Sequence, residues 1–414
     1  MTATALARLL ARYARGLHGV ADGPHHVASP LGAWLLLALC APLARGPLRA
    51  RLSEVLGTEP EEAASLAAGL LADPHPAVGC GAAVWSRSAL DTEELRDWKA
   101  GLPAMVGTGD IPDQATLDRW ARERTLGHLE RFPLEVDRSA VLVMASVLGT
   151  RVSWARPFDL VPASALGSFS AWSARPGQAL HAPPGDPRHR AFIADTEAAG
   201  TVAVHTAIAR DGLEVTSVAA ATGVAPADVL ATAHEIACTG AGTSGGASRR
   251  SLFELPVGEA PLWTIREEQV DTASPDGREE LCAAVLPAWS AESDLDLAGP
   301  VLGFPAAAGA LAEALRLDDY RYEARQSAVA RYGRVGFEAA AVSALAIKTS
   351  ARHRRPGLRR VGELHFGHPF AVVAVAVAGA AEGGHLGAGE GTSGRSWHGL
   401  PVFSAWVSEP EEPG

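Results

Sequence analysis

The chain has 414 residues, of which 47% are apolar and 20% are charged, and its formal net charge is -11. This composition is typical of a globular protein with enough apolar residues for a large core. The acidic balance argues against nucleic-acid binding, because neutralising phosphate groups requires clustered cations.

The opening segment, 4–17, has apolar residues at a helical period. Arg8 and Arg12 interrupt its apolar residues, so it does not resemble a signal peptide. The longest apolar run, 370–381, is shorter than a membrane-spanning helix and is typical of a buried strand. We therefore expect a cytoplasmic protein that binds no membrane.

The first third of the chain is predicted to be mainly helical. Ser29-Pro30 begins a helix, because serine can cap it and proline fits its first turn. This helix is apolar nearly all round over 31–41, which predicts that it is buried. Further helices are expected over 48–56, 92–102 and 115–129, and a strand over 80–86.

Strands dominate the rest of the chain. The apolar run 140–148 predicts a strand covered on both faces. Segments 198–208 and 213–219 predict a hairpin that turns at Asp211-Gly212. Other expected elements are helices over 226–237 and 305–315, strands over 282–286, 370–377 and 401–407, and Gly-rich connections over 239–248 and 379–394. Helices followed by strands indicate one α+β domain, with a mainly helical part (1–135) and a sheet-rich part (136–414).

Six segments, in order along nearly the whole chain, resemble motifs of the serpin family. They are Ser29-Pro-Leu-Gly-Ala-Trp34 running on to Leu52-Ser-Glu-Val-Leu-Gly57, the helix Leu117–Gly127, Val141–Ser146 with Trp154-Ala-Arg-Pro-Phe-Asp159, Leu286-Pro-Ala-Trp-Ser-Ala-Glu292, Gly336-Phe-Glu-Ala-Ala-Ala341 and Phe366-Gly-His-Pro-Phe370. Their order identifies the chain as a member of this family, of bacterial type and with a divergent reactive loop. The resemblance implies a single-domain α+β serpin fold with about nine helices, three sheets and an exposed reactive-centre loop.

The resemblance also implies inhibition of a serine protease without any cofactor. The protease cleaves the loop and forms an acyl-enzyme, and the loop then inserts as a new strand into the main sheet. Small side chains such as those of Ala339 to Ala341 suit insertion between two existing strands. The hinge implied here consists of Arg334, Gly336, Phe337, Glu338, Ala339, Ala340, Ala341 and Val342.

The hinge departs from the family pattern at two positions. Phe337 stands where the family usually has Thr or Ser, and inserting it into a packed core costs on the order of 1–3 kcal/mol. Arg334 stands where an acidic residue is usual. The family's polar network beneath the main sheet also changes, and its positions hold the shutter-like residues His25, Ser29, Ser146 and Gln326.

The scissile bond can be counted from either side of the loop. Counting forward from Gly336 places it near Ser350-Ala351, and counting back from Phe366 places it near Leu358-Arg359. We favour the first count, because the length of an inserting strand is mechanically constrained. The candidate region contains Lys348, Ser350, Ala351, Arg352, Arg354, Arg355, Leu358 and Arg359. Its arginines indicate a trypsin-like or a subtilisin-like, dibasic-cleaving protease as the partner, with a solvated charged loop as the alternative.

The expected function is that of a monomeric protease inhibitor, and two alternatives remain open. One alternative is a non-inhibitory serpin with a substrate-like loop or a binding role, and another is an enzyme of small-molecule metabolism on the serpin scaffold, for which no catalytic residue can be named. The G-x-S-x-G match at 242–246 lacks the strand–turn–helix context of a nucleophile. The cysteines are far apart and predict buried free thiols, and no metal site is expected: Cys40, Cys80, Cys238 and Cys282.

Overall fold

The computed structural model describes residues 3–21, 23–125, 127, 129–132, 134–136, 140–150, 152–172, 176–239, 247–336, 355–377 and 395–413. The chain divides into two compact units. Unit 1 comprises Met1–Arg151, Ala291–Ala330 and Ala374–Ala405, and unit 2 comprises Val152–Ser290, Arg331–Val373 and Trp406–Gly414.

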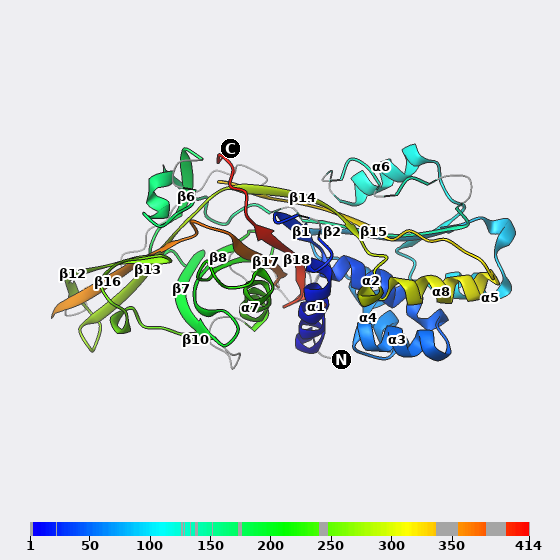
Figure 1. Cartoon of the computed structure of the whole chain (residues 1–414), viewed down its shortest axis with the longest axis horizontal. Coiled ribbons are helices and arrows are strands. Elements are labelled where there is room, and N and C mark those ends of the chain that lie inside the picture. Colours follow the sequence, from blue (N-terminus) through cyan, green and yellow to red (C-terminus); the bar gives the residue numbers. More distant parts are fainter. Residues whose placement is uncertain are drawn as a thin grey trace, which may run out of the picture. The chain divides into compact units, whose positions relative to one another are not determined.

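Unit 1 contains seven of the eight α-helices found in the described residues. They are α1 (Ala3–His18), α2 (Pro30–Cys40), α3 (Gly46–Leu56), α4 (Pro60–Ala72), α5 (Glu93–Ala100), α6 (Gln114–Arg124) and α8 (Phe304–Leu315). The apolar helix α2 is buried and packs against α4 and α8 (Figure 1). The Ser29 side chain accepts a hydrogen bond from the Gly32 amide, as expected of a helix cap.

The strands of unit 1 lie in separate sheets. The order β3-β2-β4 joins β3 (Val106–Gly109), β2 (Val78–Ser86) and β4 (Leu142–Thr150), while β14 (Trp289–Asp296) pairs with β15 (Arg325–Tyr332). β1 (His26–Ala28) lies next to β18 (Pro401–Val407), which neighbours β17 (Phe370–Ala376). α6 covers β2 and β4 through a cluster that includes Trp85, Leu117 and Val143, and Val329 of β15 packs against the same cluster (Figure 1).

Unit 2 contains two sheets and α7 (Pro226–Thr239), which packs on β9. The first sheet runs through β9 (Leu213–Ala219), β8 (Gly200–Ile208), β7 (His189–Thr196) and β10 (Ser248–Arg249). The second has the order β11-β12-β16-β13-β6-β5. Its strands are β11 (Gly258–Ala260), β12 (Trp263–Thr272), β16 (Arg355–His365), β13 (Arg278–Leu286), β6 (Gln178–Ala182) and β5 (Asp159–Pro162). β12, β16 and β13 extend together as a long ribbon (Figure 1).

The predicted helices and strands are confirmed, with ends that shift by a few residues. The strand predicted over 140–148 is β4, but it is fully buried on one face and partly exposed on the other, so the prediction that both faces are covered is wrong. The predicted hairpin is β8–β9, and Gly212 in its turn has a φ of +82°. The predicted connection over 239–248 is shorter than expected, because Thr239 ends α7 and Ser248 begins β10. Residues 240–246 and 378–394 lie outside the described residues.

Two further predictions from composition can be compared with the structure. Within the described residues, every helix is either too short or too polar to span a bilayer. The four cysteines are free thiols, but burial is complete only for Cys40, whereas the other three are half-buried.

Candidate functional site

The segment that follows β15 is fixed by backbone hydrogen bonds within unit 2. The Phe158 amide donates to the Arg334 carbonyl over 3.0 Å, and the Trp154 amide donates to the Val335 carbonyl over 3.3 Å. The Trp154 indole nitrogen donates to the Gly333 carbonyl over 2.9 Å. We call segments 153–158 and 333–336 together the hinge anchor, because they hold the backbone that leads into the predicted hinge.

Gly336 ends the hinge anchor with a conformation that requires glycine. It forms an isolated antiparallel bridge with Ser153, and its φ is +77°. A β-carbon at this position would lie 2.2 Å from the Val152 carbonyl oxygen, which is far inside van der Waals contact. The family-like glycine is therefore needed both for its backbone conformation and for its close approach to segment 152–153.

The rings of Trp154 and Phe158 in the hinge anchor belong to an aromatic cluster. Trp154 packs edge-on against Phe158 and lies 4.8 Å from the ring centroid of Tyr332. Trp289 stacks on Tyr332, with ring centroids 5.9 Å apart. Because Trp154 is 2% exposed, the W-x-x-P-F segment forms part of a core and presents its backbone to residues 333–336.

Two histidines lie beneath Phe158 in the same unit. The ring centroids of His189 and His205 lie 4.5 Å and 5.7 Å from that of Phe158. His189 Nδ1 lies 3.2 Å from His205 Nε2, and His189 Nε2 donates to the Arg156 carbonyl over 2.8 Å. Burial lowers the pKa of both imidazoles, and the neighbouring His189 lowers that of His205 further.

In unit 1, three of the four predicted shutter-like residues meet at the start of α2. The Ser29 amide donates to Gln326 Oε1 over 2.8 Å, and Gln326 Nε2 donates to the Ser29 carbonyl over 2.9 Å. Ser146 Oγ donates to the Gly32 carbonyl over 2.7 Å. Ser29 Oγ donates to the Val402 carbonyl over 2.9 Å. The first turn of α2 is thus bonded to side chains from both β4 and β15.

The fourth predicted residue, His25, is half-buried, and its neighbour His26 makes the polar contacts that the structure brings together here. His26 Nε2 lies 2.8 Å from His18 Nδ1, and His18 Nε2 lies 2.7 Å from Ser404 Oγ. The sequence reasoning missed His26. The adjacent pair His25-His26 was visible, but the sequence does not show that β1 begins at His26 and buries it while His25 stays outside the strand.

The predicted reactive-bond residues fall in two groups. Phe337, Glu338, Ala339, Ala340, Ala341, Val342, Lys348, Ser350, Ala351, Arg352 and Arg354 lie outside the described residues. Arg355, Leu358 and Arg359 lie in β16, which pairs with β12 on one side and, from Leu358 onward, with β13 on the other. Leu358-Arg359, the bond counted back from Phe366, is therefore in the middle of a sheet and not in an open loop.

Two arginines of β16, Arg359 and Arg360, are paired with carboxylates. Arg359 lies between Glu268 and Glu279, at 3.1 Å and 2.9 Å, and Arg360 lies 2.8 Å from Glu267. These pairs join strands that are far apart in sequence. They leave neither guanidinium available as the recognition group for a protease.

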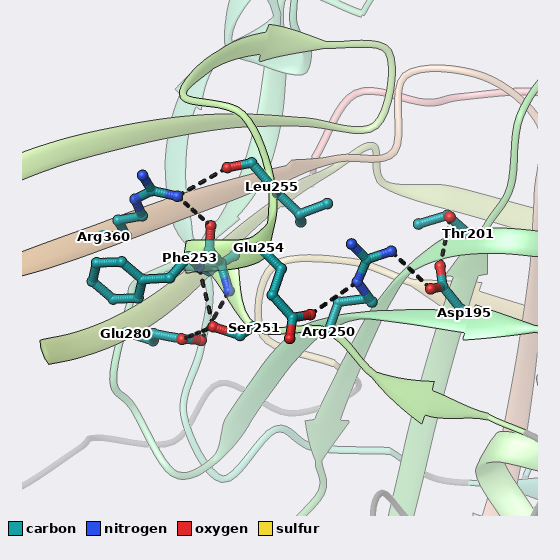
Figure 2. A network of polar contacts seen from close by, with 10 residues as sticks. Asp195, Thr201, Arg250, Ser251, Phe253, Glu254, Leu255, Glu280 and Arg360 are labelled. Carbon is teal, nitrogen blue, oxygen red and sulfur yellow. Dashed lines mark hydrogen bonds and ion pairs between the residues drawn. The ribbon is translucent and has the colours of Figure 1, made fainter. Parts of the chain in front are cut away.

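Arg360 also fixes a short turn that follows β10, the 3-10 turn Leu252–Glu254. Its Nη1 donates to the carbonyls of Leu252 and Leu255 over 2.7 Å and 2.9 Å, and its guanidinium lies 4.8 Å from the Phe253 ring centroid (Figure 2). Figure 2 also shows Arg250 between Asp195 and Glu254, which joins the start of this turn to β7. β16 is consequently a fixed end point for the segment that precedes it.

The comparisons with known proteins agree on the architecture. No family model and no curated protein sequence matches the chain. Among solved structures, the thermophilic serpin tengpin in its native state is 12% identical with a TM-score of 0.60, over 97% of this chain and 94% of that one. Human thyroxine-binding globulin in complex with thyroxine is 13% identical with a TM-score of 0.61, over 100% of both chains. An Arabidopsis serpin in its native stressed conformation is 14% identical with a TM-score of 0.59, over 99% of both.

The chain has the serpin fold. The hinge anchor of this serpin fold comes directly after β15, and β16 begins 19 residues after Gly336, at Arg355. The segment that the sequence predicts to be a reactive loop therefore lies between two fixed positions. Its length between them, 337–354, is shorter than the span 334–362 that the sequence predicted, because residues 355–362 belong to a sheet.

Proposed function

We propose that this protein inhibits a serine protease, as a monomer and without a cofactor, by cleavage of the segment between Gly336 and Arg355 and insertion of its first part between β4 and β15. The observation that carries the proposal lies in unit 1. Val143 of β4 and Val329 of β15 share one apolar cluster, yet the two strands belong to separately hydrogen-bonded sheets among the described residues. Ser146 and Gln326 bond these strands to α2 instead.

This arrangement suits the entry of a further strand. A new strand between β4 and β15 would gain backbone hydrogen bonds on both sides without breaking an existing ladder in the described residues. The segment that follows Gly336 carries three consecutive alanines, Ala339 to Ala341, whose small side chains can enter between packed strands. Because β16 is fixed, cleavage is the step that frees the segment to move.

The type of protease is inferred from the arginine and lysine side chains that are not bonded within the sheet. Arg359 and Arg360 are paired within the sheet, and Arg355 donates to the Ser274 carbonyl over 3.1 Å. The recognition residue is therefore proposed to lie among Lys348, Ser350, Ala351, Arg352 and Arg354. Arginine or lysine there suits a protease with an acidic specificity pocket, either trypsin-like or subtilisin-like and dibasic-cleaving.

The test is to mix the purified protein with trypsin, and separately with subtilisin, at near-equal molar ratio and to analyse the boiled mixture on a denaturing gel. We expect a band at the summed mass, together with a released C-terminal fragment whose first residue identifies the scissile bond. Ala341→Arg should be cleaved without forming the band, because a long cation would enter the sheet. Ala340→Arg is the matched control, since alternate residues of a strand face opposite sides.

A second candidate function, a non-inhibitory serpin with a binding role, is favoured by Phe337 at the first inserting position. A loop that is clipped with no covalent band for either protease would contradict inhibition of these enzymes. The melting temperature of the clipped protein then separates the remaining cases. A rise would show that the segment inserts but too slowly to trap the protease, and no rise would favour the binding role.

A further inference from the structure

The His189–His205 contact fixes the protonation of both rings when they are neutral. A carbonyl can only accept, so His189 Nε2 carries the proton that it donates to Arg156. His189 Nδ1 is then an acceptor, and His205 Nε2 must donate to it across 3.2 Å. His205 Nδ1 is left without a proton, and it has no hydrogen-bond partner within the described part of the chain.

Protonation of this pair creates a conflict. A proton added to His189 Nδ1 would face the N–H of His205, so His205 would have to move its own proton to Nδ1. That N–H would then be buried without an acceptor, because His205 is 0% exposed and its Nδ1 has no hydrogen-bond partner among the described residues. A second proton would place two cations in contact in the same buried site.

The charged groups that act on the pair do so through His189. Arg156, Asp159 and Asp186 act on His189, and the Arg156 guanidinium lies 3.8 Å from Asp159 and 3.9 Å from Asp186. From the aromatic side, the titratable group is the buried phenol of Tyr332, whose pKa is raised by burial and which stays neutral over the acidic range. At His205 itself, burial and the neighbouring His189 both lower the pKa of the imidazole.

The pair is mechanically linked to the hinge anchor. His189 holds the Arg156 carbonyl, and both rings pack under Phe158. Phe158 in turn donates its amide to the Arg334 carbonyl and packs against Tyr332. A displacement of either imidazole therefore acts on the segment that holds residues 333–336.

We propose that the His189–His205 pair is an acid-sensitive latch: it holds segment 153–158 against residues 333–336 at neutral pH and releases the hinge anchor when the pair takes up a proton. This inference rests on the proposed function, because the hinge anchor precedes the segment that we propose to insert. Release of the anchor can nevertheless be measured without any protease, so the two proposals can fail separately.

The direction of the pH effect follows from burial. Both histidines have a pKa below the unfolded value of about 6.5, so the released state binds protons more readily than the latched state. The latch is therefore complete above about pH 6.5 and weakens as the pH falls below that value. For one proton taken up on release, the population of the released state rises about tenfold between pH 7.5 and pH 5.5.

The experiment is hydrogen exchange followed by mass spectrometry on the full chain at pH 7.5, 6.5 and 5.5, with rates corrected for the intrinsic effect of pH. We expect peptides covering 152–160 to lose protection about tenfold by pH 5.5, while peptides from β12, which lies in the same unit and contains no histidine, keep theirs. His205→Gln keeps a donor near the Nε2 position and cannot titrate, so it should weaken the pH dependence. His398→Gln, at an exposed histidine of unit 1, should leave it unchanged.

Three results would overturn the latch. They are constant protection of 152–160 in the wild type across this pH range, an equal loss in β12 that reports global unfolding, and an undiminished pH effect in His205→Gln. If His205→Gln does not fold, imidazole NMR of the wild type decides the question. Titration of both rings near pH 6.5 with no change in the Phe158 amide would also refute the proposal.

Discussion

Gly336 lies directly against Val152. A β-carbon on Gly336 would be 2.2 Å from the Val152 carbonyl oxygen and 2.9 Å from the Ser153 α-carbon. Because all of these neighbours are backbone atoms, no side-chain rotation can make room. Gly336, which lies at the start of the proposed inserting segment, is therefore positioned by the backbone of the segment that carries Trp154.

Gly336→Ala should destabilise the protein by roughly 2 kcal/mol or more, from the left-handed backbone conformation and from the displaced contact. Gly333→Ala is the matched control, because a β-carbon at Gly333 meets nothing within 4 Å. Urea unfolding of both variants measures the difference. Equal midpoints for the two variants would contradict the position assigned to Gly336.

Gln326→Ala should destabilise unit 1 by about 1–3 kcal/mol. Gln326 satisfies both the amide and the carbonyl of Ser29, which are buried at the start of α2. Its removal leaves the Ser29 amide without this acceptor, leaves the Ser29 carbonyl with only the Ala33 amide 3.3 Å away, and releases β15 from the helix. Gln269→Ala, at an exposed position of β12, is the control and should change the unfolding midpoint little.

The regular elements were predictable because each carries its own local pattern. Ser29-Pro30 followed by apolar residues specified the capped, buried helix α2, and Asp211-Gly212 specified the β8–β9 hairpin. β16 was not predicted, since Arg355-Pro-Gly-Leu-Arg-Arg360 has the composition of a loop. It is a strand that pairs with β12 and β13, whose carboxylates neutralise Arg359 and Arg360, and a single sequence contains no sign of that pairing.

The candidate site likewise contains residues that the sequence located and residues that it did not. Ser29, Ser146 and Gln326 were located through the family resemblance, and they do converge at α2. The pair His189 and His205 has no sequence signal, because the residues lie on different strands. In the β7–β8 register His189 faces Ala207 and His205 faces Ala191, so the two imidazoles are diagonal neighbours. Only the register of this hairpin brings them together.

Arg360→Ala should cost about 2–3 kcal/mol, more than Arg359→Ala. The Arg360 side chain is 15% exposed and holds two backbone carbonyls, whereas the Arg359 side chain is 30% exposed and makes only ion pairs, which contribute about 0–1 kcal/mol near a surface. Arg360→Lys should recover little of the loss, because an ammonium group lacks the planar fork. Thermal unfolding of the three variants ranks them, and a larger loss for Arg359→Ala would refute this account of β16.

His234 provides a separate test of acid stability within α7. It is 2% exposed, neither ring nitrogen has a partner in the described residues, and burial lowers its pKa to about 4. The unfolded imidazole has a pKa of about 6.5, so the unfolded state takes up the proton first as the pH falls. The stability associated with a neutral His234 is full above pH 6.5 and is lost progressively towards pH 4, by about 3 kcal/mol in all.

His234→Leu should remove that loss. We expect it to be as stable as the wild type or more stable at pH 7.5, because it also removes two unpartnered buried nitrogens. Its advantage should grow as the pH is lowered to 4.5 in urea unfolding experiments. His398→Leu, at an exposed histidine, controls for the loss of one imidazole. A constant difference between His234→Leu and the wild type at every pH would mean that His234 reaches solvent and titrates normally in the folded protein.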